Sequence, residues 1–312
     1  MKIGYFADGP WSHLALDKII HDKEMEVAFI VPRFDTQDPV LKKKSEELGI
    51  DFLPIKDVNT SESIEKLEKY NADIYVSMSF NQILKSDILS RPNLGFINCH
   101  AGALPFYRGR NVLNWVLIND EKEFGVTVHY IDEGIDTGDI ILQKKSKILD
   151  SDNYGSILDK AILLCSETLH EALNEILSGT VKRVEQNSIH PIGFYCGKRI
   201  EGDEWIDWSW SSRKVFNFVR AISEPGPCAH TSHAGSILKI RKAEIIKDAP
   251  NYIGTPGEVA GKGKGFLIIK TGDSTIKIFI DASISEDNQD NLKKLRIGDR
   301  LISQEFIDLI KK

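Results

Sequence analysis

The sequence has few cysteines and no long apolar run. Four cysteines occur in 312 residues, and their spacing shows no pairs: Cys99, Cys165, Cys196 and Cys228. Scattered cysteines of this kind predict free thiols in a reducing compartment. No apolar run approaches the ~20 residues that a membrane-spanning helix needs, and the first nine residues lead directly into a strand pattern with no secretory apolar region. We therefore expect a cytoplasmic protein with no membrane partner.

An excess of positive charge is also absent. The formal net charge is −6 and the isoelectric point is about 5.8. Proteins that bind nucleic acid through its phosphates usually carry a basic face. The two basic patches, at residues 42–44 and 262–264, are short and are typical of solvated surface. We expect no nucleic-acid partner.

Several motifs of common enzyme classes are missing. The stretch from Gly4 to Gly9 does not form the G-x-G-x-x-G pattern, and no P-loop occurs. No serine or cysteine stands in a nucleophile-elbow pattern. Cys228, His230 and His233 lack the paired spacing of a structural zinc site, so we expect no metal.

Short apolar runs alternate with helical patterns in the first part of the chain. Strands are predicted at residues 2–7, 25–31, 51–55 and 73–77, and helices at 13–21, 41–48, 60–70 and 82–89. This alternation predicts an α/β fold: a Rossmann-like, mostly parallel sheet with helices on both faces. A long helix is predicted over 152–177. From residue 236, short β runs separated by glycines predict a small antiparallel, barrel-like domain. We expect one domain at 1–200 and a second at 201–312.

The stretch at residues 94–143 contains the most chemistry. Its first apolar run ends in Asn98 and His100, where a strand of an open α/β sheet would deliver them to the ligand crevice. Cys99 lies between them and should point to the opposite face, as a packing residue. Asp136 follows in an acidic loop after the next strand. A histidine, an orienting carboxylate and an amide that donates to an oxyanion would together serve acyl transfer. Since no protein nucleophile is evident, the substrate should supply one, most simply an amine.

The order of motifs resembles the formyltransferase family that uses 10-formyltetrahydrofolate. Asn98-x-His100 is followed by Leu104-Pro105-x-Tyr107-Arg108-Gly109, then by Gly125-Val126-Thr127-Val128-His129 and by Asp132-x-Gly134-Ile135-Asp136-Thr137-Gly138. The resemblance covers residues 1–200. The pattern Trp208-Ser209-Trp210, with Val219 and Arg220 after it, is similar to the start of the C-terminal domain in methionyl-tRNA and aminoarabinose formyltransferases.

The resemblance implies a role for each matching position. Asn98, His100 and Asp136 match the catalytic residues. The residues that match the site of the co-substrate 10-formyltetrahydrofolate are Ser77, Met78, Ser79, Arg110, Asp132, Glu133, Gly134 and Ile135, together with Asp136. For the acceptor we expect contacts from Trp11, Tyr107 and Arg220. Simple packing remains an alternative for Trp11, and a surface ion pair remains one for Arg220.

Within the family, residues 96–102 and 106–111 look most like sugar-nucleotide N-formyltransferases. The implied acceptor is a dTDP- or UDP-linked amino sugar for surface polysaccharide biosynthesis. The loop at residues 32–39 is short and acidic, whereas the tRNA enzymes typically carry a longer basic loop there. Methionyl-tRNA formyltransferase is the alternative function. A non-catalytic folate- or nucleotide-binding module and a formyl-folate hydrolase are further alternatives, and a homodimer is kept open as the assembly.

A mechanism follows as a hypothesis. The unprotonated amine attacks the formyl carbon, and Asn98 and His100 stabilise the tetrahedral oxyanion or manage its protons. Asp136 positions His100, raises its pKa and collects the amine proton through water.

Overall fold

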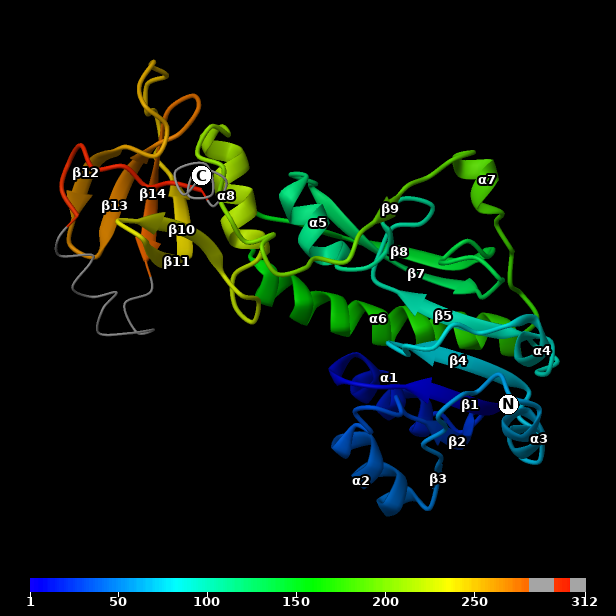
Figure 1. Cartoon of the computed structure of the whole chain (residues 1–312). Helices are drawn as coiled ribbons and strands as arrows, with labels where there is room; N and C mark the ends of the chain where they lie inside the picture. Colours follow the sequence, from blue (N-terminus) through cyan, green and yellow to red (C-terminus); the bar gives the residue numbers. More distant parts are fainter. Residues whose placement is uncertain (281–294, 304–312) are drawn as a thin grey trace. The chain divides into compact units, whose positions relative to one another are not determined.

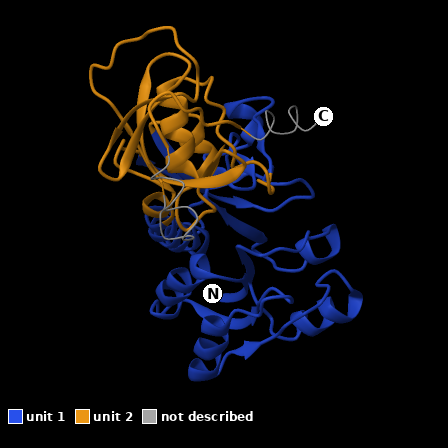
Figure 2. Cartoon of the chain, turned by 60° about the vertical axis from the view of Figure 1, so that its left-hand side comes forward, with its two compact units in different colours: residues 1–112, 123–147, 159–197 blue, residues 113–122, 148–158, 198–312 orange. Residues whose placement is uncertain are grey.

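The computed structural model describes residues 1–280 and 295–303. It divides the chain into two compact units (Figure 2). The first comprises residues 1–112, 123–147 and 159–197, and the second comprises residues 113–122, 148–158 and 198–312. The chain passes finally into the second unit at Lys198, and two earlier segments also belong to that unit.

The first unit is built on a seven-stranded sheet in the order β3-β2-β1-β4-β5-β7-β8 (Figure 1). Its strands are β1 (Lys2–Ala7), β2 (Glu26–Val31), β3 (Asp51–Phe52), β4 (Ile74–Met78), β5 (Phe96–His100), β7 (Glu123–Tyr130) and β8 (Ile140–Lys147). The first five run parallel, and β7 and β8 pair antiparallel. This confirms the mostly parallel α/β sheet. The strand β8 was not predicted.

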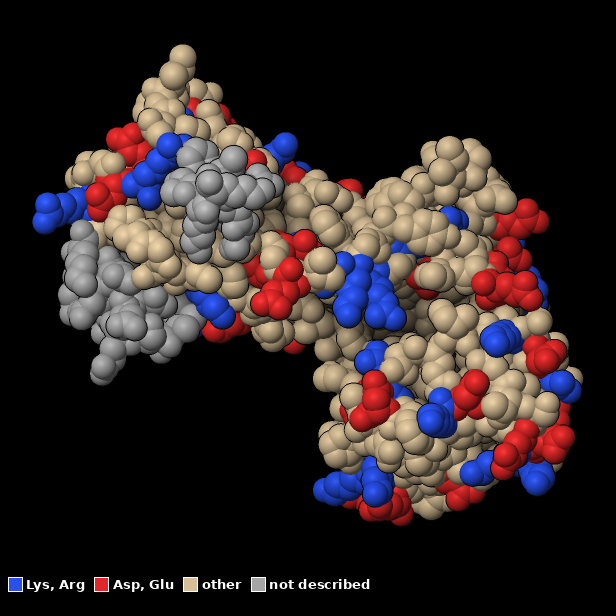
Figure 3. All heavy atoms as spheres, viewed as in Figure 1, with Lys and Arg blue, Asp and Glu red and all other residues tan. Residues whose placement is uncertain are grey.

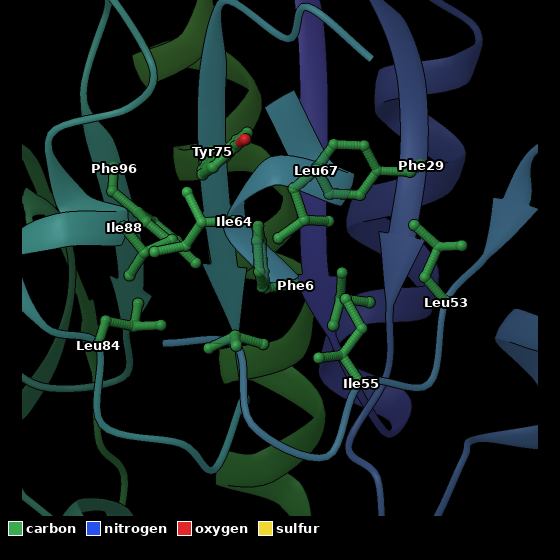
Figure 4. Packing of buried hydrophobic residues seen from close by; sticks show 12 residues of the cluster. Phe6, Phe29, Leu53, Ile55, Ile64, Leu67, Tyr75, Leu84, Ile88 and Phe96 are labelled. Atoms are coloured by element: carbon green, nitrogen blue, oxygen red, sulfur yellow. The ribbon is translucent and has the colours of Figure 1, made fainter. Parts of the chain in front are cut away.

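Helices cover both faces of this sheet. The helices in this part of the chain are α1 (Pro10–Ile20), α2 (Pro39–Leu48), α3 (Ser61–Glu68), α4 (Ser86–Leu89), α6 (Tyr154–Leu177) and the short α7 (Gln186–Ile189), whose first residue contacts loops of the site. On one face Phe6 and Phe96 pack with Ile64 of α3 and Ile88 of α4 (Figure 4). On the other face, Tyr5 of β1 donates a hydrogen bond to the Ser12 carbonyl of α1. Side chains alternate between the faces of a strand, and the central strand β4 is buried along its whole length, on both faces.

Local sequence explains where the helices begin. The Asp38 side chain accepts hydrogen bonds from the backbone N–H groups of Val40 and Leu41, and Pro39 takes the first helical position of α2. The helix predicted over residues 82–89 is wrong in its first half, because α4 begins only at Ser86. The Gln82 side chain bonds the Ile55 carbonyl and the Val58 N–H, which holds residue 82 in the loop.

The second unit contains a five-stranded antiparallel sheet in the order β10-β11-β14-β13-β12. The strands are β10 (Ala229–His233), β11 (Ser236–Ile245), β12 (Val259–Gly263), β13 (Phe266–Lys270) and β14 (Thr275–Ile280). Residues 299–302 bond both edges: Ile302 pairs with Ser232 of β10, and Asp299 accepts from Val259 of β12. This bridging confirms a separate antiparallel sheet and gives it a barrel-like closure. The unit also contains α8 (Ser212–Ala221) and most of α5 (Val112–Ile118).

Candidate active site

The candidate site lies at the carboxyl ends of β4 and β5. The two strands are parallel, and Ser77 of β4 is in register with Asn98 of β5. On the far side of β5, the antiparallel strand β7 places His129 opposite Asn98. His100 is the last residue of β5 and is 8% exposed. Polar side chains of three neighbouring strands therefore meet at one edge of the sheet, where ligands bind in open α/β folds.

Asp136 lies between two histidines. Its Oδ2 is 3.6 Å from Nδ1 of His100, and its Oδ1 is 3.5 Å from Nε2 of His129. Oδ2 also accepts a 2.9 Å hydrogen bond from the backbone N–H of Gly109. The loop after β7 that carries Asp136 closes on itself, since the N–H of Tyr130 donates to the Asp139 carbonyl. The structure thus brings the three residues of the predicted catalytic set together and adds His129 to them.

The hydrogen bonds of the two imidazoles define their tautomers. Nε2 of His100 bonds the Tyr107 carbonyl at 2.7 Å, and Nδ1 of His129 bonds the Tyr130 carbonyl at 2.7 Å. A carbonyl oxygen only accepts, so these nitrogens carry the hydrogens. In the neutral rings the nitrogens that face Asp136 are therefore bare. Asn98 Nδ2 lies 3.3 Å from Nε2 of His129 and donates one of its two N–H groups there.

The charges in this cluster are set by burial and by neighbouring groups. Burial lowers the pKa of His100 below its ordinary value of 6.5, and this outweighs the opposing effects of the Asp136 carboxylate and the Tyr107 carbonyl. Asp136 acts to raise the pKa of His100, as expected, but desolvation of the imidazolium outweighs this effect and the net shift is downward. Burial acts to raise the pKa of Asp136, but the protonated forms of His100 and His129, a side-chain hydrogen bond with His129 and the Gly109 N–H together hold it well below its usual range. At neutral pH the site contains a carboxylate beside a neutral His100.

The loop between β5 and α5 supplies two of these backbone contacts. Tyr107 presents its carbonyl to His100, and Gly109, in the short strand β6 (Arg108–Gly109), presents its N–H to Asp136. Gly102 lies against both the His100 imidazole and the Tyr107 carbonyl. A Cβ atom at Gly102 would lie 2.5 Å from both His100 Nε2 and the Tyr107 carbonyl oxygen, so no side chain fits there. The close approach of this loop to the imidazole therefore requires glycine at position 102.

Cys99 does not share this site. Its Sγ lies 3.6 Å from the Cys165 carbonyl oxygen of α6. The side chain is directed to the face of the sheet opposite to Asn98 and His100, which confirms the prediction that it packs. The four cysteines are free and buried.

The residues expected to bind the folate lie at the end of β4, directly after β6 and in the loop after β7. Met78 is buried at the end of β4, and Ser79 follows in a left-handed conformation, with its carbonyl and hydroxyl held by the Arg33 guanidinium. Arg110 follows β6, is exposed, and donates its backbone N–H to the Cys196 carbonyl.

The acidic loop after β7 is exposed from residue 132 to residue 135. Asp132 orders it by accepting bonds from the Gly134 N–H and the Thr137 hydroxyl. Glu133 and Ile135 extend toward solvent, and Ile135 is 55% exposed. An exposed apolar side chain on an ordered loop is suited to a flat ring system.

The three residues expected to contact the acceptor differ in their burial and in the contacts that their side chains already make. Trp11 is half-buried in the first turn of α1, directly after the carboxyl end of β1. Tyr107 is 6% exposed, and its ring packs edge-on against Phe194 at 4.8 Å. Arg220 belongs to the second unit and is 6% exposed; its guanidinium donates to the Leu149 carbonyl and to Asn217. Bonds within its own unit therefore occupy the guanidinium of Arg220.

His129 was missed as a site residue from the sequence. It belongs to the apolar run at residues 126–130, and reasoning from the polar residues at strand ends passed over it. In the antiparallel register of β5 and β7, His129 lies opposite Asn98, and Thr127 lies opposite His100. Thr127 also donates its hydroxyl to the Gly102 carbonyl, beneath the same imidazole. The register between the strands, and not the spacing along the chain, therefore brings His129 to the site.

Within residues 1–280 and 295–303, no group of three or more His, Cys, Asp or Glu side chains is arranged to hold a metal ion. Over the same residues, no helix is long and apolar enough to span a membrane.

Comparison with known proteins shows the family. The family model described as "Formyl transferase" matches residues 2–173, and the model "Formyl transferase, C-terminal domain" matches residues 200–289. A methionyl-tRNA formyltransferase of Clostridioides difficile is 33% identical over 309 residues, covering 96% of each chain. One of Geobacter metallireducens is 33% identical over 240 residues, covering 77% of this chain and 75% of the relative.

A solved structure shares the fold. The N-formyltransferase from Helicobacter canadensis, in complex with folinic acid and dTDP-3-aminofucose, has a TM-score of 0.70 at 22% identity. The match covers 90% of this chain and 99% of that one. The two family models and the relatives at 33% identity show that the chain belongs to the formyl transferase family.

Proposed function

We propose that the protein transfers a formyl group from 10-formyltetrahydrofolate to the amine of a nucleotide-linked amino sugar. The observation that carries the chemistry is the Asp136 carboxylate between two imidazoles, with the Asn98 amide beside them. This set provides proton acceptors and an oxyanion donor but no nucleophile, and Cys99 is directed away from it. Such a site suits a reaction in which both reacting groups come from the substrates.

The proposed reaction balances without a further reactant. The amine nitrogen forms a bond to the formyl carbon, and the bond from that carbon to N10 of the folate breaks. The second N–H of Asn98 donates to the oxyanion of the tetrahedral intermediate. The bare nitrogen of His100, paired with the Asp136 carboxylate, takes the amine proton through water, and this same proton is then returned to N10 of the folate.

The co-substrate is inferred from the same edge of the sheet. The Helicobacter canadensis enzyme was solved with folinic acid, a formyl-folate. In this chain the ordered loop at residues 132–135, with exposed Ile135, and the end of β4 at Met78 and Ser79 are the proposed folate contacts. Arg110 is the proposed partner of a folate carboxylate, because guanidinium groups bind carboxylates well.

A nucleotide-linked sugar is favoured as the acceptor by the loop between β2 and α2. This loop is short, and its acids are engaged in the fold: Asp38 bonds the Gly9 N–H and His13. Around α2 and α3, Lys and Arg alternate with Asp and Glu on the face that Figure 3 shows. A net charge of −6 adds no general attraction for a polyanion.

Methionyl-tRNA is the second candidate acceptor. The observation in its favour is sequence identity, since relatives at 33% identity are methionyl-tRNA formyltransferases. An enzyme of that kind would bind tRNA with an affinity that falls steeply as salt increases.

The experiment is a product assay by mass spectrometry. The protein is incubated with 10-formyltetrahydrofolate and either dTDP- and UDP-linked amino sugars or charged initiator tRNA. The proposal predicts a gain of one formyl group on at least one sugar nucleotide, and the Asp136→Asn variant serves as the inactive control. Formylation of the tRNA alone would replace the proposed acceptor, and no formylation of any acceptor would contradict formyl transfer.

A further inference from the structure

A single buried glutamine lies behind the loop that carries Asp136. Gln186 is the first residue of α7 and is 3% exposed. Its Nε2 donates to the Asp136 carbonyl at 2.9 Å and to the Gly138 carbonyl at 2.8 Å. Its Oε1 accepts from Nε and Nη2 of Arg108, at 3.0 and 2.7 Å. One amide therefore joins the two loops that build the site.

The chemistry of the partners fixes the orientation of this amide. Guanidinium nitrogens only donate and carbonyl oxygens only accept, so the oxygen of Gln186 must face Arg108 and its nitrogen must face Asp136 and Gly138. All four contacts are satisfied at once. Neither glutamate nor any apolar residue reproduces this arrangement, because neither donates to the two carbonyls.

Arg108 is held as firmly as its partner. It is 6% exposed, its Nη1 donates to the Ile192 carbonyl, and its guanidinium stacks on the Tyr195 ring at 5.4 Å. Arg108 is also in the strand β6, whose parallel pairing with β9 (Tyr195–Cys196) joins it to the segment after α7. The next residue, Gly109, donates its N–H to the Asp136 carboxylate.

Arg108 is thus connected to Asp136 in two ways. Its neighbour Gly109 donates a backbone N–H to the Asp136 carboxylate, and its side-chain partner Gln186 donates to the Asp136 carbonyl. Asp136 has a φ of 54°, a left-handed conformation that is uncommon outside glycine and needs support from its surroundings. Both ends of the strained residue are held by this arrangement.

We propose that Gln186 is a positioning residue of the active site, which holds Asp136 between His100 and His129 by bonding its carbonyl to Arg108. The inference rests on formyl transfer at this site. Gln186 lies in a polar segment and acts through Asp136, without itself touching the reacting atoms.

The test uses the full chain with Gln186→Glu and Gln186→Ala. Glutamate keeps the volume and the pairing with Arg108 but turns oxygens toward both carbonyls. We expect kcat to fall about 10- to 100-fold in both variants, since small displacements of catalytic groups cost rates of this order. The KM for the acceptor should stay within about twofold, because the residue acts on catalysis and not on acceptor binding.

A matched control is Gln82→Glu. Gln82 also bridges two backbone groups, at Ile55 and Val58, but it has no bond to the loop of Asp136. The same chemical change there should lower the melting temperature and leave kcat within about twofold. If Gln186→Glu and Gln82→Glu lower kcat equally, a general structural effect explains the result and the proposal is overturned.

Amide hydrogen exchange gives a readout that does not need activity. In Gln186→Glu the Gly109 N–H and residues 136–138 should exchange at least about tenfold faster, while β1 and β4 exchange as in the wild type. Unchanged exchange at Gly109, or wild-type kcat in both folded Gln186 variants, would overturn the positioning role. A wild-type protein that formylates nothing would instead count against the proposed function, and the exchange measurement would still decide on Gln186.

Discussion

Asp136 Oδ2 lies 3.6 Å from the unprotonated Nδ1 of His100, whose other nitrogen bonds the Tyr107 carbonyl. A proton that reaches Nδ1 converts this contact into an ion pair. The pair is therefore arranged to stabilise the imidazolium that forms when the amine loses its proton, and it does not need a charged histidine beforehand.

The first prediction concerns the carboxylate. Asp136→Asn keeps the size of the side chain but removes the charge that stabilises protonated His100. We expect kcat to fall by about 10²- to 10⁴-fold, the usual range for a lost acid–base group. Steady-state kinetics measure the loss, and circular dichroism confirms that the variant is folded. A variant with near-normal kcat would remove Asp136 from the mechanism.

The second prediction concerns pH. Burial lowers the pKa of His100 below 6.5, so its neutral form persists in the folded enzyme to lower pH than in a free histidine. The acid limb of kcat should therefore lie below pH 6.5. Because the unfolded chain binds this proton more readily, stability should also decrease as the pH falls from 6.5 toward the folded pKa. An acid limb above pH 6.5 that stays unchanged when acceptors with amines of different pKa are compared would contradict a neutral His100.

The third prediction concerns the oxyanion donor. Asn98→Ala removes the N–H that is proposed to stabilise the tetrahedral intermediate, and it also removes the bond to His129. We expect kcat to fall about 10²- to 10³-fold with little change in KM. A change confined to KM would show that Asn98 binds the ground state instead.

The fourth prediction concerns the loop beneath His100. In Gly102→Ala the new methyl group would lie 2.5 Å from both His100 Nε2 and the Tyr107 carbonyl oxygen. The hydrogen bond between them must break, so we expect kcat to fall at least about tenfold. Gly197→Ala is the control, because a Cβ there meets nothing within 4 Å. Equal kinetics for the two alanine variants would refute the steric argument.

The fifth prediction concerns Arg220. Its removal leaves the Leu149 carbonyl and Asn217 without their buried donor. Arg220→Met should reduce the free energy of unfolding by about 1–3 kcal/mol, measured by urea denaturation. The KM for the acceptor should not change. A raised KM with unchanged stability would favour the acceptor contact that was expected of Arg220 from the sequence.

Much of the fold followed from sequence patterns, because apolar runs and helical periods reflect burial directly. The strand β8 did not, since Lys144, Lys145 and Lys147 interrupt its apolar pattern at the edge of the sheet. The early start predicted for α4 failed because a side-chain contact of Gln82 overrides helical spacing.

The site residues were predictable from the sequence where polar side chains stand at the end of a predicted strand or in the loop that follows one. Asn98, His100 and Asp136 are separated by at most 38 residues and meet as expected. His129 depends on strand register, and Gln186 lies 50 residues beyond Asp136 in a polar segment without a motif. Their positions are set by tertiary pairing, which a single sequence does not reveal.

The most direct measurement is kcat/KM for each acceptor at fixed 10-formyltetrahydrofolate and ionic strength. The account predicts that one dTDP- or UDP-linked amino sugar is formylated with a kcat/KM at least about 100-fold above that of charged initiator tRNA. The Asp136→Asn variant should lose this activity. A higher kcat/KM for the tRNA, lost in the same variant, would contradict the proposed acceptor while leaving formyl transfer at this site intact.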